Sequence, residues 1–261
     1  MRKITKRRVI FIVKTTAFSQ MEQTMAANMK KSEPGLAAPL AHARITGLIG
    51  TAVLASGSFT GFVVSKLIVP GDVAATSGNI LASESLFRLG IAGSLIMMIA
   101  FLFYALFLYR LLRPVNASRA RIMVALVLVS VPIYMLNQVN QFAALLASSE
   151  RLYDQVKLFL ELHRFGNLVG GIFFGLWLFP LGLLVFKSGF FPRFLGILLM
   201  FGGLGYLILF VQAFLFPGSE RTLWTNPFLV VTHASELAMM MWLLIRGLNA
   251  EQWRKRSSET I

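Results

Sequence analysis

The sequence predicts an all-α, polytopic membrane protein with six transmembrane helices in one bundle and both termini in the cytoplasm. Of its 261 residues, 56% are hydrophobic and 14% are charged, and the mean hydropathy is +0.71. Soluble domains are less apolar and carry about one charged residue in four. A helix needs about 20 apolar residues to cross some 30 Å of hydrocarbon, and the chain repeatedly supplies stretches of that length.

The connections between the apolar stretches are short, so neighbouring helices are expected to run antiparallel. A basic lead (1–43) and a basic tail (248–261) flank the predicted transmembrane domain (44–247). The six predicted spans are 45–69, 89–109, 122–147, 160–186, 195–216 and 227–245.

Basic residues predict the orientation, because cytoplasmic segments next to membrane helices are enriched in Lys and Arg. With the N-terminus inside, 19 of the 25 Lys and Arg residues fall on the cytoplasmic side and six on the other. The formal net charge of +14 is therefore mainly a topology signal, and nucleic-acid binding is not expected. The expected location is the cytoplasmic membrane of a bacterium.

Several kinds of chemistry are excluded or unsupported. The chain has no cysteine, which removes disulfides, thiolate metal sites and cysteine nucleophiles. It contains no HExxH, GxSxG or phosphate-loop motif, and no cofactor is expected. In the lead, the apolar run 9–13 is too short for a signal-peptide core, so 1–43 is read as a cytoplasmic tail or an over-extended start, with attraction to anionic lipid as an alternative.

Glycines at helical spacing predict where helices approach closely. Such GxxxG pairs drive helix association in lipid, where the hydrophobic effect between helices is absent. They indicate that the first and fourth spans are central in the bundle, with homodimerisation through the same faces as the alternative. The pairs are Gly57/Gly61, Gly166/Gly170 and Gly171/Gly175.

Polar residues inside the spans are the main functional clue. Counted at about 1.5 Å per residue from each helix end, they fall in one layer near the outer surface. Polar groups are costly in hydrocarbon, so their faces are expected to turn toward each other or toward water. The sequence thus predicts an outward-facing pocket between the third, fourth and sixth spans that takes a small molecule, a lipid or an ion. The predicted lining is Arg88, Asn137, Gln141, His163, Arg164, Asn167, His233 and Glu236.

Other readings of the same residues stay open. Glu236 is either a ligand-contacting or proton-carrying acid, or the partner of Arg164 or Arg88 in a structural ion pair. His163, His233 and Glu236 are weak metal candidates and would make the protein an intramembrane enzyme using metal or acid–base chemistry. A purely structural or assembly protein, with a dry polar layer, is the third possibility.

The first connection, 69–84, contains a Pro-Gly turn followed by apolar residues spaced at three and four. This spacing suggests a short interfacial helix that covers the proposed pocket. The alternative is a plain structured connection.

Four stretches resemble a known bacterial membrane family. They are SKLIVPGDVAATSGNILASESLFRLGIAGSLI, YRLLRPVNAS, LHRFGNLVGGIFFGLWLFPLGLLVFKSGFFPRFLGILL and SELAMMMWLLIRG. Together they are similar to the family labelled domain of unknown function 4386, over roughly residues 44–247. The resemblance implies a multi-pass membrane protein and supplies no established activity. It places the family's motifs on Pro70, Gly71, Arg88, Arg113, Pro114, His163, Gly166, Gly189, Pro192 and Glu236, and it implies an acid in many members where this chain has Ser94.

Overall fold

The computed structural model describes residues 37–216 and 226–259, and every element in these ranges is a helix. Residues 39–261 form one compact unit, to which the account below refers. Most of the basic lead lies outside the described residues. The helices are α2 (Ala37–Leu67), α3 (Val73–Ala82), α4 (Glu84–Leu112), α5 (Ala117–Ser149), α6 (Tyr153–Ser188), α7 (Arg193–Leu215), α8 (Pro227–Ile245) and α9 (Ala250–Ser258).

Six of these helices, α2 and α4 to α8, are long and apolar enough to cross a membrane. They coincide with the six predicted spans, so the prediction of an all-helical polytopic protein is confirmed. Large apolar side chains remain exposed on all six, for example Leu48, Phe103 and Leu136. A soluble monomer rarely exposes apolar surface on this scale, whereas lipid tails accept it. The side of the membrane that each end faces remains a prediction.

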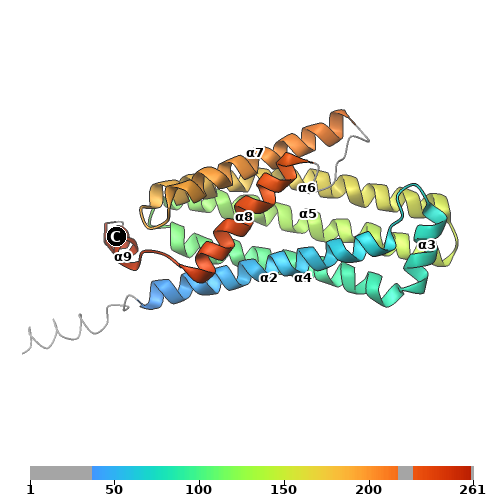
Figure 1. Ribbon diagram of the computed structural model, residues 1–261, viewed down its shortest axis with the longest axis horizontal. Helices are drawn as coiled ribbons and strands as arrows, with labels where there is room; N and C mark the ends of the chain where they lie inside the picture. Colours follow the sequence, from blue (N-terminus) through green and yellow to red (C-terminus); the bar gives the residue numbers. More distant parts are fainter. Residues whose placement is uncertain (1–36, 217–225, 260–261) are drawn as a thin grey trace, which may run out of the picture. The chain divides into compact units, whose positions relative to one another are not determined.

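The spanning helices from α4 to α8 pack mainly against their neighbours in sequence, with α6 between α5 and α7. Helix α8 runs obliquely from beside α7 to α2 (Figure 1). The short helix α3 packs against α5 and α6 at one end of the bundle, and α9 lies at the other end (Figure 1). We refer to these as the α3 end and the α9 end. The short helix predicted in the first connection is present as α3, whose first turn is capped by the Asp72 carboxylate 2.8 Å from the Ala75 amide. Its interfacial position remains a prediction.

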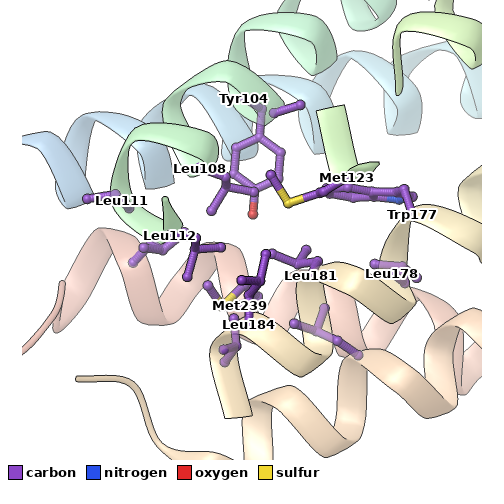
Figure 2. Packing of buried hydrophobic residues seen from close by; sticks show 14 of the residues in the cluster. Tyr104, Leu108, Leu111, Leu112, Met123, Trp177, Leu178, Leu181, Leu184 and Met239 are labelled. Carbon is purple, nitrogen blue, oxygen red and sulfur yellow. The ribbon is translucent and has the colours of Figure 1, made fainter. Parts of the chain in front are cut away.

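The core is apolar and aromatic toward the α9 end. Figure 2 shows side chains from α4, α5, α6 and α8 converging there, among them Tyr104, Met123, Trp177 and Met239. Trp177 is 1% exposed, and its ring meets Phe101 edge-on at a centroid distance of 5.0 Å. Edge-to-face aromatic pairs add to area burial. This cluster fixes the relative positions of α4 and α6.

Glycines set the closest helix contacts. A Cβ at Gly182 in α6 would lie 2.6 Å from the Gly196 carbonyl oxygen in α7, and one at Gly203 in α7 would lie 2.8 Å from the Gly175 carbonyl oxygen in α6. A side chain at Gly47 in α2 would overlap the backbone of α8. Since the neighbours are backbone atoms, these contacts exist only because the residues have no side chain.

The prediction that both the first and the fourth helix are central is wrong for the first. The apolar window of α6 is 44% buried inside the protein, the largest share among the spans, whereas that of α2 is 17% buried, the smallest. The reason lies in the glycines. A Cβ at Gly57 would meet the Met97 sulfur at 2.9 Å, but one at Gly61 would meet nothing within 4 Å. Gly57 thus approaches α4 and Gly61 does not, and the contact between α2 and α4 here includes the Thr60 hydroxyl, which donates to the Gly90 carbonyl oxygen at 3.2 Å.

The basic tail is helical over residues 250–258 and is attached to the bundle. The indole N–H of Trp253 in α9 donates to the Leu111 carbonyl oxygen in α4 at 2.9 Å. In the loop before α9, the Asn249 amide donates to the Phe190 carbonyl oxygen at 3.1 Å. These two hydrogen bonds hold α9 and the turn between α6 and α7 together at one end of the bundle.

The close contact between α6 and α7 gives a first prediction. Alanine is the better helix former by about 1 kcal/mol, so Gly171→Ala in α6, where an added Cβ has open space, is expected to keep or raise the melting temperature. Gly182→Ala is expected to lower it, since overpacking costs about 1–3 kcal/mol. Thermal unfolding in detergent measures both, and equal melting temperatures would contradict this account of the interface.

Candidate functional site

A hydrogen-bonded cluster joins α5 to α6 in the half of the bundle toward the α3 end. The Asn137 side-chain N–H₂ donates to the His163 carbonyl oxygen at 2.8 Å and to Asn167 Oδ1 at 2.9 Å. Asn137 Oδ1 in turn accepts from Asn140 at 2.9 Å. Asn137 is 7% exposed, and each of its bonds replaces one that water would otherwise make. The cluster therefore fixes the register of α5 against α6.

The His163 ring is held at both nitrogens. Nδ1 lies 3.2 Å from the Asn137 carbonyl oxygen, and because a carbonyl can only accept, Nδ1 carries the proton. Nε2 is then an acceptor, and it lies 2.7 Å from Gln141 Nε2 and 3.1 Å from Asn167 Nδ2, both of which are donors. These three contacts are the ones that a neutral imidazole protonated at Nδ1 makes.

Sequence local to α5 and α6 explains the position of these groups. Asn137 and Gln141 are one turn apart in α5, and His163 and Asn167 are one turn apart in α6, so each pair shares a helix face. Gly166 lies between the two α6 residues, and a Cβ there would overlap the Asn137 side chain. The missing side chain at Gly166 makes room for the amide.

A cavity of about 280 Å³ adjoins the cluster, between α2, α4, α5 and α6. Its apolar wall comes from α2 and from Met97 and Met98 of α4. Among the residues that the structure describes, its lining includes no Asp, Glu, Lys or Arg. The hydrogen-bonding residues that line it are Thr60, Ser94, Tyr134, Gln138, Gln141, His163 and Asn167.

The cavity wall has hydrogen-bonding capacity that the protein does not use. Gln138 is 4% exposed; its Nε2 donates to the Tyr134 carbonyl oxygen at 3.2 Å. Its Oε1 is buried and has no hydrogen-bond partner. The Thr60 hydroxyl, by contrast, is bonded to the Ser56 and Gly90 carbonyl oxygens at 3.1 and 3.2 Å, and the Ser94 hydroxyl donates to it at 3.4 Å. Buried polar atoms are nearly always satisfied, so an orphaned acceptor beside a cavity points to a missing partner.

Glu236 occupies a different place from the predicted one. Its carboxylate accepts a hydrogen bond from the Tyr206 hydroxyl of α7 at 3.0 Å, and it does not line the cavity. Tyr206 stacks on Phe174 at a centroid distance of 6.0 Å, and Phe174 follows His163 by roughly 16 Å along α6. The acid therefore lies toward the middle of the bundle, and the predicted common depth of Glu236 and His163 is not what the geometry shows.

Glu236 is nevertheless linked to the cavity wall through tyrosines. Its hydrogen-bond partner Tyr206 stacks on Phe174. The Tyr134 hydroxyl donates to the Asn167 carbonyl oxygen at 3.0 Å, and its ring packs on Phe174 at 4.8 Å. Tyr134 is thus the shared wall between the cavity and the acid.

Four other predicted residues do not line the cavity. Asn137 lies in the hydrogen-bonded cluster beside it. Arg88 forms a surface ion pair with Glu84 one turn earlier, at 2.7 Å. Arg164 pairs with Glu161 at 2.7 Å and also covers the Phe165 ring. His233 is exposed, and its Nδ1 lies 2.8 Å from the Leu229 carbonyl oxygen of its own helix.

The ion pair considered for Glu236 with Arg164 or Arg88 is therefore not formed, because each arginine has a nearer acid on its own helix. The predicted metal set His163, His233 and Glu236 is not assembled either. Within the described ranges, no group of three His, Cys, Asp or Glu side chains is placed to hold a metal ion. Four residues of the predicted lining do lie together, in the hydrogen-bonded cluster between α5 and α6: Asn137, Gln141, His163 and Asn167.

Sequence reasoning missed five of the residues that matter here. Gln138 follows Asn137 directly in the outer half of the third predicted span, but the predicted lining took only Asn137 and Gln141 from that span. In many membrane helices the hydroxyl groups of Ser and Thr bond to the backbone of their own helix. The presence of Thr60 and Ser94 therefore did not indicate a site. Tyr134 and Tyr206 look like core aromatics, and only packing shows that their hydroxyls meet polar partners.

A second prediction follows from the cluster. Asn137→Ala is expected to lower stability by about 1–3 kcal/mol, because it leaves several buried groups without partners. Asn140→Ala removes a single bond from a less buried residue and is expected to cost less. Gly166→Ala should resemble Asn137→Ala, since the added methyl displaces the amide. Thermal unfolding checks all three, and a larger effect for Asn140→Ala than for Asn137→Ala would contradict the assignment.

Comparison with known proteins gives a family without an assigned activity. The family model described as domain of unknown function (DUF4386) matches residues 45–247. An uncharacterized protein of Archaeoglobus fulgidus is 37% identical over 79 residues, which is 30% of this chain and 44% of the archaeal protein. The match thus spans less than half the length of that relative. No solved structure shows significant similarity. Since the matched region contains all six spanning helices and the cavity, the chain belongs to the DUF4386 family of multi-pass membrane proteins.

Proposed function

We propose that this protein binds a small, uncharged molecule in the cavity between α2, α4, α5 and α6. The observation that carries the proposal is the composition of the wall: hydroxyl, amide and imidazole groups face methionine and glycine, with no Asp, Glu, Lys or Arg. Such a wall offers hydrogen bonds and apolar contact but nothing that neutralises an ionic ligand.

The volume and the unused acceptor support the same ligand class. A cavity of about 280 Å³ is at the small end of ligand sites. Gln138 Oε1 lacks a donor, and the neutral His163 ring is already held by Asn137, Gln141 and Asn167. A ligand that donates one hydrogen bond and carries a short apolar body complements this wall.

The entry point is proposed on α2, beside Gly61 and Val64. Both residues line the cavity and are exposed, and a Cβ at Gly61 would meet nothing within 4 Å. A glycine that packs against no helix leaves an opening in the wall. The finer topology is part of the proposal. The protein spans the cytoplasmic membrane of a bacterium with both termini in the cytoplasm and the α3 end facing outward, as the distribution of basic residues indicates.

A metalloenzyme that uses His163, His233 and Glu236 is not proposed, because these side chains have separate partners on separate faces. The remaining alternative is a structural protein whose polar layer is packed without water or ligand. The following experiment distinguishes this alternative from a binding cavity.

A third prediction uses the absence of native cysteine. Ser94→Cys places a nearly isosteric thiol in the cavity wall. N-ethylmaleimide, a small uncharged reagent, is expected to label it at a rate that saturates with reagent concentration, because binding precedes reaction. An anionic thiosulfonate should react far more slowly, since the wall has no basic side chain. Labelling is measured by intact-protein mass spectrometry.

The control for this experiment blocks the proposed opening beside Gly61 with a large side chain. Adding Gly61→Phe to Ser94→Cys is expected to reduce the labelling rate by about tenfold or more, whereas Gly171→Phe, also a glycine facing open space, should leave it unchanged. An unreactive Ser94→Cys in both reagents would indicate a dry layer. Equal rates with and without Gly61→Phe would contradict the proposed entry.

A further inference from the structure

A second cavity lies at the α9 end, opposite the first site. It has a volume of about 430 Å³ and is formed by two loops. One is the turn between α6 and α7, residues 189–192. The other runs from the end of α8 into α9 and contributes Arg246, Asn249 and Gln252. The Asn249–Phe190 hydrogen bond joins the two loops.

Backbone conformation and hydrogen bonds fix the two loops that form the cavity. Gly189 ends α6 with φ of 77°, and Gly247 follows α8 with φ of 70°, a backbone region that favours glycine. The Asn249 side chain caps α9 by accepting from the Gln252 amide at 3.1 Å. Trp253 then fixes α9 to the end of α4. Both loops are therefore held by specific contacts.

Arg246 gives the cavity its charge. It is exposed at the end of α8, lines the cavity, and its side chain has no ion-pair partner in the described part of the chain. No Asp or Glu lines the cavity. An unpaired guanidinium over a cavity that also presents the Gln252 amide is suited to a phosphate group, which guanidinium binds in bidentate fashion.

The surroundings of Arg246 are those of a lipid site. Trp242, one turn earlier in α8, lines the same cavity, and Phe194 meets it edge-on at a centroid distance of 6.0 Å. Trp is typical of the level of the lipid headgroups. Phe194 and Ile245 are 54% and 61% exposed, so a continuous apolar surface leads from the cavity to the side of the bundle that faces acyl chains.

Charge at this end favours an anionic lipid over a zwitterionic one. Lys187 lies in the last turn of α6, Arg193 begins α7, Arg246 follows α8 and Lys255 lies in α9, whereas the acids of α9 and its C-cap are Glu251 and Glu259. Basic side chains near a membrane surface attract anionic headgroups. We infer that the cavity at the α9 end binds the headgroup phosphate of one anionic phospholipid beside Arg246 and Gln252, with its chains along Trp242 and Phe194.

The test uses the full chain in nanodiscs of phosphatidylcholine with or without phosphatidylglycerol, followed by native mass spectrometry of retained lipid. The wild type is expected to retain phosphatidylglycerol in preference to phosphatidylcholine. Arg246→Gln is expected to weaken this retention about five- to tenfold, as the loss of one basic contact near the surface implies. Arg246→Lys should restore part of it, because the charge returns without the planar donor pair.

The matched control is Arg110→Gln, which removes an exposed arginine at the same end, in the last turn of α4, outside the cavity. It should retain phosphatidylglycerol as the wild type does. The inference is overturned if Arg246→Gln and Arg110→Gln behave alike, if phosphatidylcholine is retained equally well, or if inorganic phosphate displaces the lipid completely, which would assign the cavity to a soluble phosphate compound. Circular dichroism melts of each variant establish that folding is not the cause.

Discussion

The structure depends on one constraint: inside a bilayer, hydrogen-bonding groups must be satisfied by the protein itself. The cluster of Asn137, Gln141, His163 and Asn167 meets this constraint between α5 and α6. Asn137 donates to Asn167, and Gln141 and Asn167 both donate to His163 Nε2, so the four polar residues satisfy one another within a membrane helix pair. The cluster also sets the register that places the cavity wall.

The same constraint explains the environment of Glu236. An acid toward the middle of a bundle is costly, and no described basic side chain pairs with it. Tyr206 donates a hydrogen bond to it. Tyrosine suits this role because its ring packs in the apolar core while its hydroxyl reaches a polar partner.

The bundle is chemically asymmetric along its length. Toward the α3 end it holds the polar cluster and an uncharged cavity, and the α9 end combines an apolar aromatic core with a basic rim. The two cavities consequently suit different ligands. One offers amides and hydroxyls to a neutral molecule, and the other offers a guanidinium to a phosphate. The glycine contacts between α6 and α7 connect the halves by fixing the two helices backbone to backbone.

The sequence by itself determined the six spanning helices, the α3 helix and the polar pairing of α5 with α6. The length of a span, its apolarity and one-turn spacing are local properties of the sequence, and they do not depend on tertiary contacts. Tertiary structure alone decided which polar residues meet. Glu236 meets Tyr206 of α7 and His233 is exposed, because the rotation of a helix about its axis is set by packing and not by depth. The pairs of Arg88 with Glu84 and of Arg164 with Glu161, by contrast, follow from their one-turn spacing in the sequence. The same packing left Gly61 facing a cavity in place of a helix, since a glycine permits close approach but cannot by itself enforce it.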